Sequence, residues 1–109
     1  MSVIFDATHF AHMTGGDRPL QLEVIGMFRA QVSSWAAVLS PDTETGACRA
    51  AVHTLKGSAR GIGLWALAET CESTETAFDA EGAEIGAALA DLHAALAVAL
   101  TALDAFEHE

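Results

Sequence analysis

One histidine, His53, lies among most of the chain's positive charge. Three of the five lysine and arginine residues surround it in the sequence, namely Arg49, Lys56 and Arg60. If this segment is helical, with about 100° between residues, all three project within about 60° of His53. Lysine and arginine bind phosphoryl oxygens through charge-assisted hydrogen bonds, and a neutral imidazole is a nucleophile. The cluster therefore indicates a dianionic phosphoryl group on His53, neutralised by Lys56 and Arg60.

Gly57 adds a bare stretch of backbone to the same face, four residues after His53. A glycine inside a helix costs about 1 kcal/mol relative to alanine, so its presence needs a reason. The missing side chain would let another macromolecule reach the imidazole ring, which predicts a role in steric access. The alternative is an exposed histidine on a mixed-charge face, with a glycine that helix packing requires. The offsets of the three bases favour the first interpretation.

Other candidate ligands give weaker signals. His9 and His12 lie near Asp6, but a closed metal site needs three or four converging ligands, so no metal is expected. Cys48 and Cys71 fit neither a zinc spacing nor a redox pair and are expected to be small buried hydrophobes.

The remaining histidines and the acids are expected to have no catalytic role. His93 should be solvent-facing or hydrogen-bonded, and His108 lies near the end of the chain. The acids after the His53 segment are expected to form a solvated face: Glu69, Glu72, Glu75, Asp79, Glu81 and Glu84.

Helical periodicity accounts for nearly the whole chain. A short helix is expected over residues 3–13, and four long helices over about residues 17–39, 42–63, 64–78 and 83–106. Asp17 is the expected N-cap of the second helix, and Asp42 or Thr43 that of the third. Breaks are expected at Gly15-Gly16, at Ser40-Pro41-Asp42, at Gly61 and Gly63, and at Gly82. No alternating strand pattern stands out.

The apolar positions predict which helix faces form the core. They are Leu20, Leu22, Val24, Ile25, Phe28, Val32, Trp35, Val38 and Leu39; then Cys48, Val52, Leu55, Ala59 and Ile62; then Leu64, Leu67, Ala68 and Cys71; and last Ile85, Leu89, Leu92, Leu96, Leu100 and Leu103. Long amphipathic helices joined by short turns predict an all-α, antiparallel four-helix bundle with the short N-terminal helix as a lid.

Composition limits the remaining function classes. The chain has 109 residues with 15 acids and 5 bases, a formal net charge of −10, which argues against nucleic-acid binding. Its length predicts a single domain over residues 1–109. The N-terminus lacks the basic region of a secretory signal, and no charge-free apolar run of about 18 residues occurs. We therefore expect a cytoplasmic protein without a membrane segment.

The residues from His53 to Gly63 resemble the signature of histidine-containing phosphotransfer (HPt) domains. Residues 53–59 read HTLKGSA and are followed by Ile62 and Gly63, and the family signature is roughly H-x-L-K-G-[SA]-[SA]-x-x-[LI]-G. The resemblance covers about residues 15–80. The last helix is similar to the family only in length and apolar pattern.

The resemblance implies a four-helix bundle that carries phosphate in a two-component phosphorelay. His53 would accept a phosphoryl group from an aspartate of one response-regulator receiver domain and pass it to another. Lys56 would be the cation near the phosphate and Gly57 the point of steric access. Glu75 falls where some members have a glutamine that orients the phosphohistidine.

The resemblance also implies the partners and the limits of the chemistry. The chain shows no phosphate-binding glycine loop and no set of residues for nucleotide magnesium, so it is expected to carry phosphate without turnover of its own. Mg²⁺ is expected on the receiver. Met27, Ala30 and Gln31, with Arg49 and Arg60, are the expected docking residues. Expected partners are receiver domains and a hybrid histidine kinase, and the chain is expected to be a monomer.

Three other interpretations remain open at this point. The first is the dimerisation and phosphoacceptor region of a histidine kinase, which normally has an acidic residue after the histidine and a proline some residues later; here Thr54 follows His53 and no proline follows Pro41. The second is a bundle that binds, and inhibits or scaffolds, a histidine kinase or response regulator without accepting phosphate. The third is a purely structural helical module.

Overall fold

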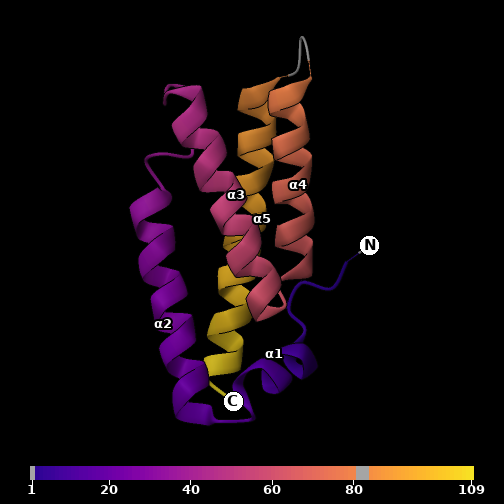
Figure 1. The fold of residues 1–109 in the computed structure, drawn as a ribbon. Helices are drawn as coiled ribbons and strands as arrows, with labels where there is room; N and C mark the ends of the chain where they lie inside the picture. Colours follow the sequence, from indigo (N-terminus) through magenta and orange to yellow (C-terminus); the bar gives the residue numbers. More distant parts are fainter. Residues whose placement is uncertain (1, 81–83) are drawn as a thin grey trace.

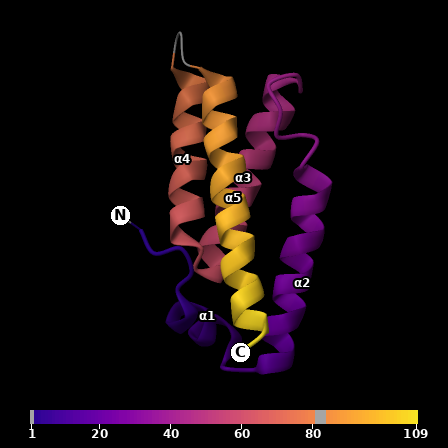
Figure 2. The same ribbon diagram turned by 180° about the vertical axis from the view of Figure 1, so that it is seen from behind.

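The computed structural model describes residues 2–80 and 84–109 and consists there of helices joined by short turns. The helices are α1 (Ala7–Thr14), α2 (Arg18–Trp35), α3 (Thr45–Ile62), α4 (Trp65–Asp79) and α5 (Ile85–Glu107). Helices α2 to α5 run alternately up and down, and α1 lies across one end of the bundle, near the C-terminus (Figures 1 and 2). The predicted all-α bundle with a short extra helix is confirmed. The expected break at Gly82, the expected start of the last helix at residue 83, and Glu81 lie outside the described residues.

Two helix starts differ from the sequence prediction. The first helix begins at Ala7 because Asp6 caps it, accepting a hydrogen bond from the backbone N–H of His9 at 3.0 Å. The third begins at Thr45, so Asp42 and Thr43 were the wrong caps. The carboxylate of Glu44 accepts from the N–H groups of Gly46 and Ala47 at 2.9 and 2.8 Å, and two such bonds satisfy two of the free donors of the first turn.

The turn between α3 and α4 needs a glycine. Gly63 has φ +93°, and a Cβ there would lie 2.9 Å from the carbonyl oxygen of Asp6. The same residue holds the N-terminal segment, because its carbonyl accepts from the N–H of Asp6 at 2.9 Å. The indole of Trp65 donates to the Asp6 carboxylate at 3.0 Å. Helix α1 is thereby fixed against the end of α3.

The core follows the predicted stripes of α3 and α4 closely. Every apolar position expected on these two helices is buried. On α5, Leu89, Leu92, Leu96 and Leu103 are buried, while Ile85 and Leu100 are partly buried. On α2, however, Leu20 and Leu22 are each 40% exposed, so the expectation that they face the core is wrong.

Helix α2 is joined to the C-terminal end of α5 by polar contacts. The guanidinium of Arg18 donates to the carbonyls of Phe106 and Glu107 at 3.1 and 2.8 Å, and Arg29 forms an ion pair with Glu107. Satisfying the free carbonyls at a helix end in this way fixes one end of α2.

Helix α5 is unusually apolar for its length. By length and composition alone it is long and apolar enough to cross a membrane. The criterion of an apolar run without any charge, applied to the sequence, did not identify this helix. Core helices of bundles are often as long and as apolar, and here the helix contributes five buried residues to the core.

Candidate functional site

The register of α3 places the candidate residues on its outer face. The core positions occur at steps of three and four, which turns the positions between them outward. The positions outside the core include Arg49, His53, Lys56, Gly57 and Arg60, of which His53, Gly57 and Arg60 are exposed. The side chain of His53 is 70% exposed, so the ring is open to a partner.

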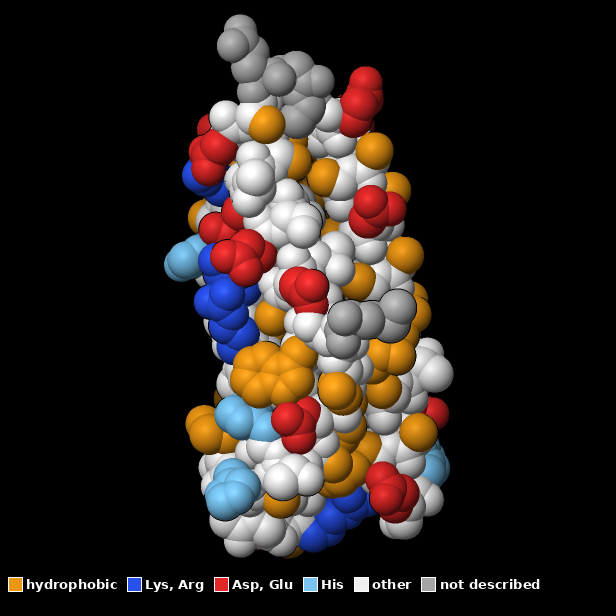
Figure 3. Space-filling model, turned by 90° about the vertical axis from the view of Figure 1, so that its right-hand side faces the viewer, with side chains coloured by type: hydrophobic (Ala, Val, Ile, Leu, Met, Phe, Trp, Pro, Cys, Tyr) orange, Lys and Arg blue, Asp and Glu red, His pale blue; other side chains and the backbone are white. Residues whose placement is uncertain are grey.

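Each of these basic side chains faces a carboxylate on the neighbouring helix. Because α4 runs antiparallel to α3, the acids follow in reverse order and form what we call the α3–α4 ion-pair ladder. The ladder consists of Arg49 Nη1 with Asp79 Oδ1 (2.6 Å), Lys56 Nζ with Glu75 Oε1 (2.8 Å) and Arg60 Nη2 with Glu72 Oε2 (3.6 Å). Figure 3 shows acidic and basic side chains interleaved along one edge of the molecule.

The ladder corrects one sequence prediction and extends another. Glu72, Glu75 and Asp79 are partners of the bases rather than a merely solvated face. The bases that were expected to surround His53 do so, and each of them also forms an ion pair with an acid of α4, which was not foreseen. The hydrogen bond between Arg49 and Asp79 raises the pKa of the guanidinium and lowers the pKa of the carboxyl. Both of these side chains are well exposed, so their pair adds little to stability.

Glu75 makes a second contact, with the candidate nucleophile. Its Oε2 lies 3.3 Å from Nδ1 of His53. A carboxylate can only accept, so Nδ1 carries the proton and donates it, and Nε2 keeps the lone pair. Partial burial raises the pKa of Glu75, but hydrogen bonds from Lys56 and His53 outweigh it and leave the pKa below its ordinary value. The ionised side chain therefore selects the tautomer in which Nε2 is the nucleophilic atom.

The side chains of Lys56 and Glu75 are less exposed than the imidazole ring of His53. Their side chains are 14% and 19% exposed. A pair in this position is held more firmly than one on the open surface, because less water screens the attraction between its two charges. The imidazole is thus oriented by a partly buried carboxylate and lysine while its other nitrogen is left accessible.

Gly57 has no packing role in this structure. A Cβ built at Gly57 meets nothing within 4 Å, and the same holds at Gly61 one turn further on. The packing explanation for Gly57 is therefore wrong, and the bare backbone faces outward beside His53. Of the two glycines, Gly61 lines the groove between α2 and α3.

An apolar groove of about 310 Å³ runs between α2 and α3 beside this bare backbone. Its lining includes Met13, Leu20, Met27, Gln31 and Gly61. Met13 and Met27 are each 62% exposed. The hydroxyl of Ser58 donates to the side-chain oxygen of Gln31 at 3.4 Å. Met27 and Gln31 thus lie beside the candidate site, and Ala30, which does not line the groove, is exposed.

The other histidines and the cysteines lie away from this face. His93 Nε2 donates to the carbonyl of Leu39 at 2.7 Å, and His9 packs against Trp65 with ring centroids 4.8 Å apart. Both cysteines are buried, as expected, and burial raises the pKa of Cys71 to about 12, so its thiol stays protonated. Within residues 2–80 and 84–109, no cluster of three or more metal-ligating side chains occurs.

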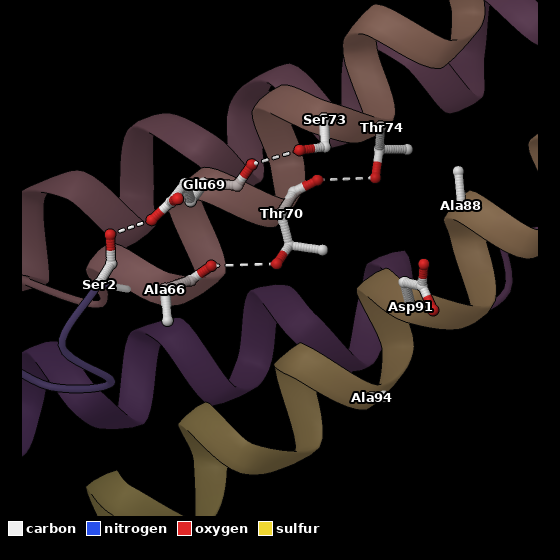
Figure 4. A pocket seen from close by; sticks show the side chains of 9 residues that line it. All are labelled: Ser2, Ala66, Glu69, Thr70, Ser73, Thr74, Ala88, Asp91 and Ala94. Carbon is white, nitrogen blue, oxygen red and sulfur yellow. Dashed lines mark hydrogen bonds between the residues drawn. The ribbon is translucent and has the colours of Figure 1, made fainter.

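Another surface hollow, of about 480 Å³, lies away from this face, between α4 and α5. Figure 4 shows that its hydroxyl groups are bonded within α4: Thr70, Ser73 and Thr74 donate to carbonyls one turn back, and Ser2 bonds Glu69. These bonds occupy the hydroxyl donors of the hollow, and its other polar side chains, Glu69 and Asp91, are carboxylates that would repel a phosphoryl group. The chemistry is therefore assigned to the outer face of α3 and not to this hollow.

Sequence reasoning missed the direct part played by three acids on α4. The only signal in the sequence is the order, since residues 72, 75 and 79 follow the reverse order of their partners 60, 56 and 49, as an antiparallel neighbour requires, but the steps between them differ. Recognising it needs the knowledge that these two faces meet.

Comparisons with known proteins agree with this geometry. The family model described as Hpt domain matches residues 23–106. The crystal structure of histidine phosphotransferase ShpA from Caulobacter crescentus is similar over 97% of this chain and 92% of that chain, with 34% sequence identity and a TM-score of 0.80. No curated protein matches the chain.

Proposed function

The chain belongs to the Hpt domain family, and from that premise we propose that His53 accepts a phosphoryl group from an aspartate of one receiver domain and passes it to another. The observation that carries this proposal is the state of the ring. Nδ1 is held by Glu75 at 3.3 Å while the side chain is 70% exposed, so Nε2 is both nucleophilic and accessible.

The transfer step is an in-line displacement at phosphorus. The lone pair of Nε2 attacks, the P–N bond forms, and the P–O bond to the aspartate breaks with its electron pair returning to the carboxylate. The proton stays on Nδ1, so the ring becomes positively charged, and its hydrogen bond to Glu75 stabilises that charge. The return transfer reverses each change. Positioning and charge therefore do most of the work, as in other phosphoryl transfers.

Lys56 is the side chain of this chain best placed to meet the phosphoryl oxygens. It follows His53 by three residues on the same face and lies in contact with the carboxylate that holds the ring. A lysine ammonium is a point charge on a flexible stem and can move between acceptors. Mg²⁺, in this proposal, is bound by the receiver domain and completes the charge neutralisation there.

The groove beside His53 is the proposed docking surface for the receiver. Met27 and Gln31 line it, and Gly57 lies next to it with no side chain in the way. Exposed methionines adapt to differently shaped partners, which suits a carrier that must dock with both a donor and an acceptor. Arg49 and Arg60 flank the approach. We propose a cytoplasmic monomer that meets receivers, including that of a hybrid kinase, one at a time.

Transfer from phosphorylated receiver domains tests the proposal directly. Short incubations with each receiver of the source organism should label the wild-type chain and not His53→Gln. The control, His93→Gln, should be labelled like the wild type, and all three should have the same far-UV circular dichroism. Labelling of His53→Gln would refute the assignment. A receiver that binds tightly but transfers no label to any histidine would favour the alternative of an inhibitor or scaffold.

A further inference from the structure

The three bases around His53 and their three carboxylate partners on α4 have no net charge together. The α3–α4 ion-pair ladder holds three bases and three carboxylates, a formal sum of 3 − 3 = 0. A phosphoryl group arriving on Nε2 brings two negative charges, and the ring gains one positive charge. The phosphorylated site is therefore one charge more negative than the resting site, with no uncompensated cation in the ladder.

Glu75 acts on this phosphorylated state in two opposite direct ways. With Oε2 3.3 Å from Nδ1, the size of an imidazole ring puts the carboxylate on the order of 4 Å from the centre of the ring's positive charge and on the order of 7 Å from a phosphorus bonded to Nε2. Attraction to one positive charge and repulsion from two negative charges at these distances nearly cancel. The direct effect of Glu75 on the phosphohistidine is therefore small.

Glu75 also has an indirect effect on the phosphohistidine, through Lys56, and no opposing effect cancels it. Lys56 Nζ lies 2.8 Å from Glu75 Oε1, and both side chains are largely enclosed. An ammonium bound to that carboxylate must give up or share its contact before it can bind the phosphoryl oxygens. The carboxylate and the phosphoryl group thus compete for one cation.

We propose that Glu75, by competing for Lys56, makes phospho-His53 a weakly held, readily discharged donor. The inference rests on the proposed function and deepens it, because a carrier of this kind passes phosphate on rather than storing it. Glu75 is a positioning residue in this account: it acts on the phosphoryl group through Lys56 and through the ring.

The competition can be measured without a protein partner. Potassium phosphoramidate phosphorylates imidazole: Nε2 attacks phosphorus, the P–N bond to the reagent breaks, and ammonia leaves. Loss of the label follows when water attacks phosphorus, the bond to Nε2 breaks, and its electron pair returns to the ring, which ends neutral with its proton on Nδ1. The transition state is loose and carries less charge on the phosphoryl oxygens, so a cation there stabilises the phosphorylated state more than the transition state.

Glu75→Gln frees Lys56 while keeping an oxygen that can accept from Nδ1. We expect the first-order loss of phosphate from His53 at pH 7 to slow about tenfold, the value of one additional charge contact at a partly enclosed site. In a Lys56→Met background, the same substitution should change the rate less than about twofold, because no cation remains to be freed. Glu69→Gln removes a charge on the same helix at a carboxylate that bonds Ser2 and is not part of the ladder, so this variant should behave like the wild type.

The outcomes separate the two proposals. An unchanged rate in Glu75→Gln, or an equal effect with and without Lys56, would overturn the competition while leaving His53 as the acceptor. Failure of phosphoramidate to label His53 in the folded wild-type chain would overturn both. A purely structural role for Glu75 predicts an altered melting temperature and no dependence on Lys56.

Discussion

Enlarging Gly57 should raise stability and lower transfer at the same time. A Cβ at this position meets nothing within 4 Å, so alanine or glutamine fits without strain. Either residue removes the helix penalty of glycine, worth about 0.5–1 kcal/mol, and should raise the melting temperature by a few degrees for a domain of this size. A glutamine side chain, however, reaches about as far from the helix as the imidazole and occupies the space where the receiver must approach.

The expected loss of transfer follows from that obstruction. Displacing the reacting atoms by about 1 Å can cost about a hundredfold in rate, so we expect Gly57→Gln to lower kcat/KM for transfer from a phosphorylated receiver at least tenfold. Gly57→Ala, with one methyl group, should lose less.

Gly26 provides a matched control for both effects. It lies within α2, and a Cβ there also meets nothing within 4 Å, yet it is not on the face of α3 that carries His53. Gly26→Gln should therefore gain similar stability in thermal unfolding and keep wild-type transfer kinetics. Unchanged transfer in Gly57→Gln, or an equal loss in Gly26→Gln, would refute the steric argument.

Two further predictions concern the scaffold that holds His53. Leu55→Ala should destabilise the chain by about 2–5 kcal/mol in urea unfolding, because Leu55 is fully buried; a loss below about 1 kcal/mol would show that α3 packs differently. The second prediction is that acid weakens the α3–α4 contact, because the pKa of Glu75 is lower in the folded chain than its ordinary value. The stability that the ionised carboxylate contributes is complete above about pH 4.5 and is lost as the pH falls through the pKa of the folded state. Glu75→Gln should therefore lose less stability than the wild type between pH 5 and about pH 3, and equal losses would contradict the pairing.

The residues on the outer face of α3 could be predicted from the sequence because their grouping depends on the geometry of one helix alone. Core positions at steps of three and four fix which residues point outward, so the grouping of Arg49, His53, Lys56 and Arg60 required only helical geometry. Gly57 could be placed on that face in the same way. The role of Gly57 could not be predicted in this way, because a glycine needed for packing and a glycine needed for access differ only in which atoms surround the position of the missing side chain.

The partners of these residues could not be predicted, because they depend on how two helices are rotated and shifted against each other. The acids of α4 look like an ordinary solvated face until α3 is placed beside them, and then Glu75 contacts both Lys56 and His53. The same limit explains Leu20 and Leu22. Apolar residues on α2 suggest burial, but Leu20 and Leu22 are each 40% exposed, and Leu20 lines the groove beside α3.

The prediction of the N-cap of α3 was wrong for a reason that lies in the local sequence. Asp42 and Thr43 are both good capping residues, and the break at Pro41 suggested that one of them begins the helix. Glu44 is a less common cap, but its longer side chain folds back to reach two backbone N–H groups. Local preference therefore predicted the right turn but placed the N-cap one or two residues too early.

The most direct test of this account identifies the atom that carries phosphate. The wild-type chain, phosphorylated by a receiver domain and examined under alkaline conditions by ³¹P NMR and mass spectrometry, should carry a single phosphoryl group on Nε2 of His53, since Glu75 occupies Nδ1. Phosphate on Nδ1 of His53, on another residue, or on none would contradict it.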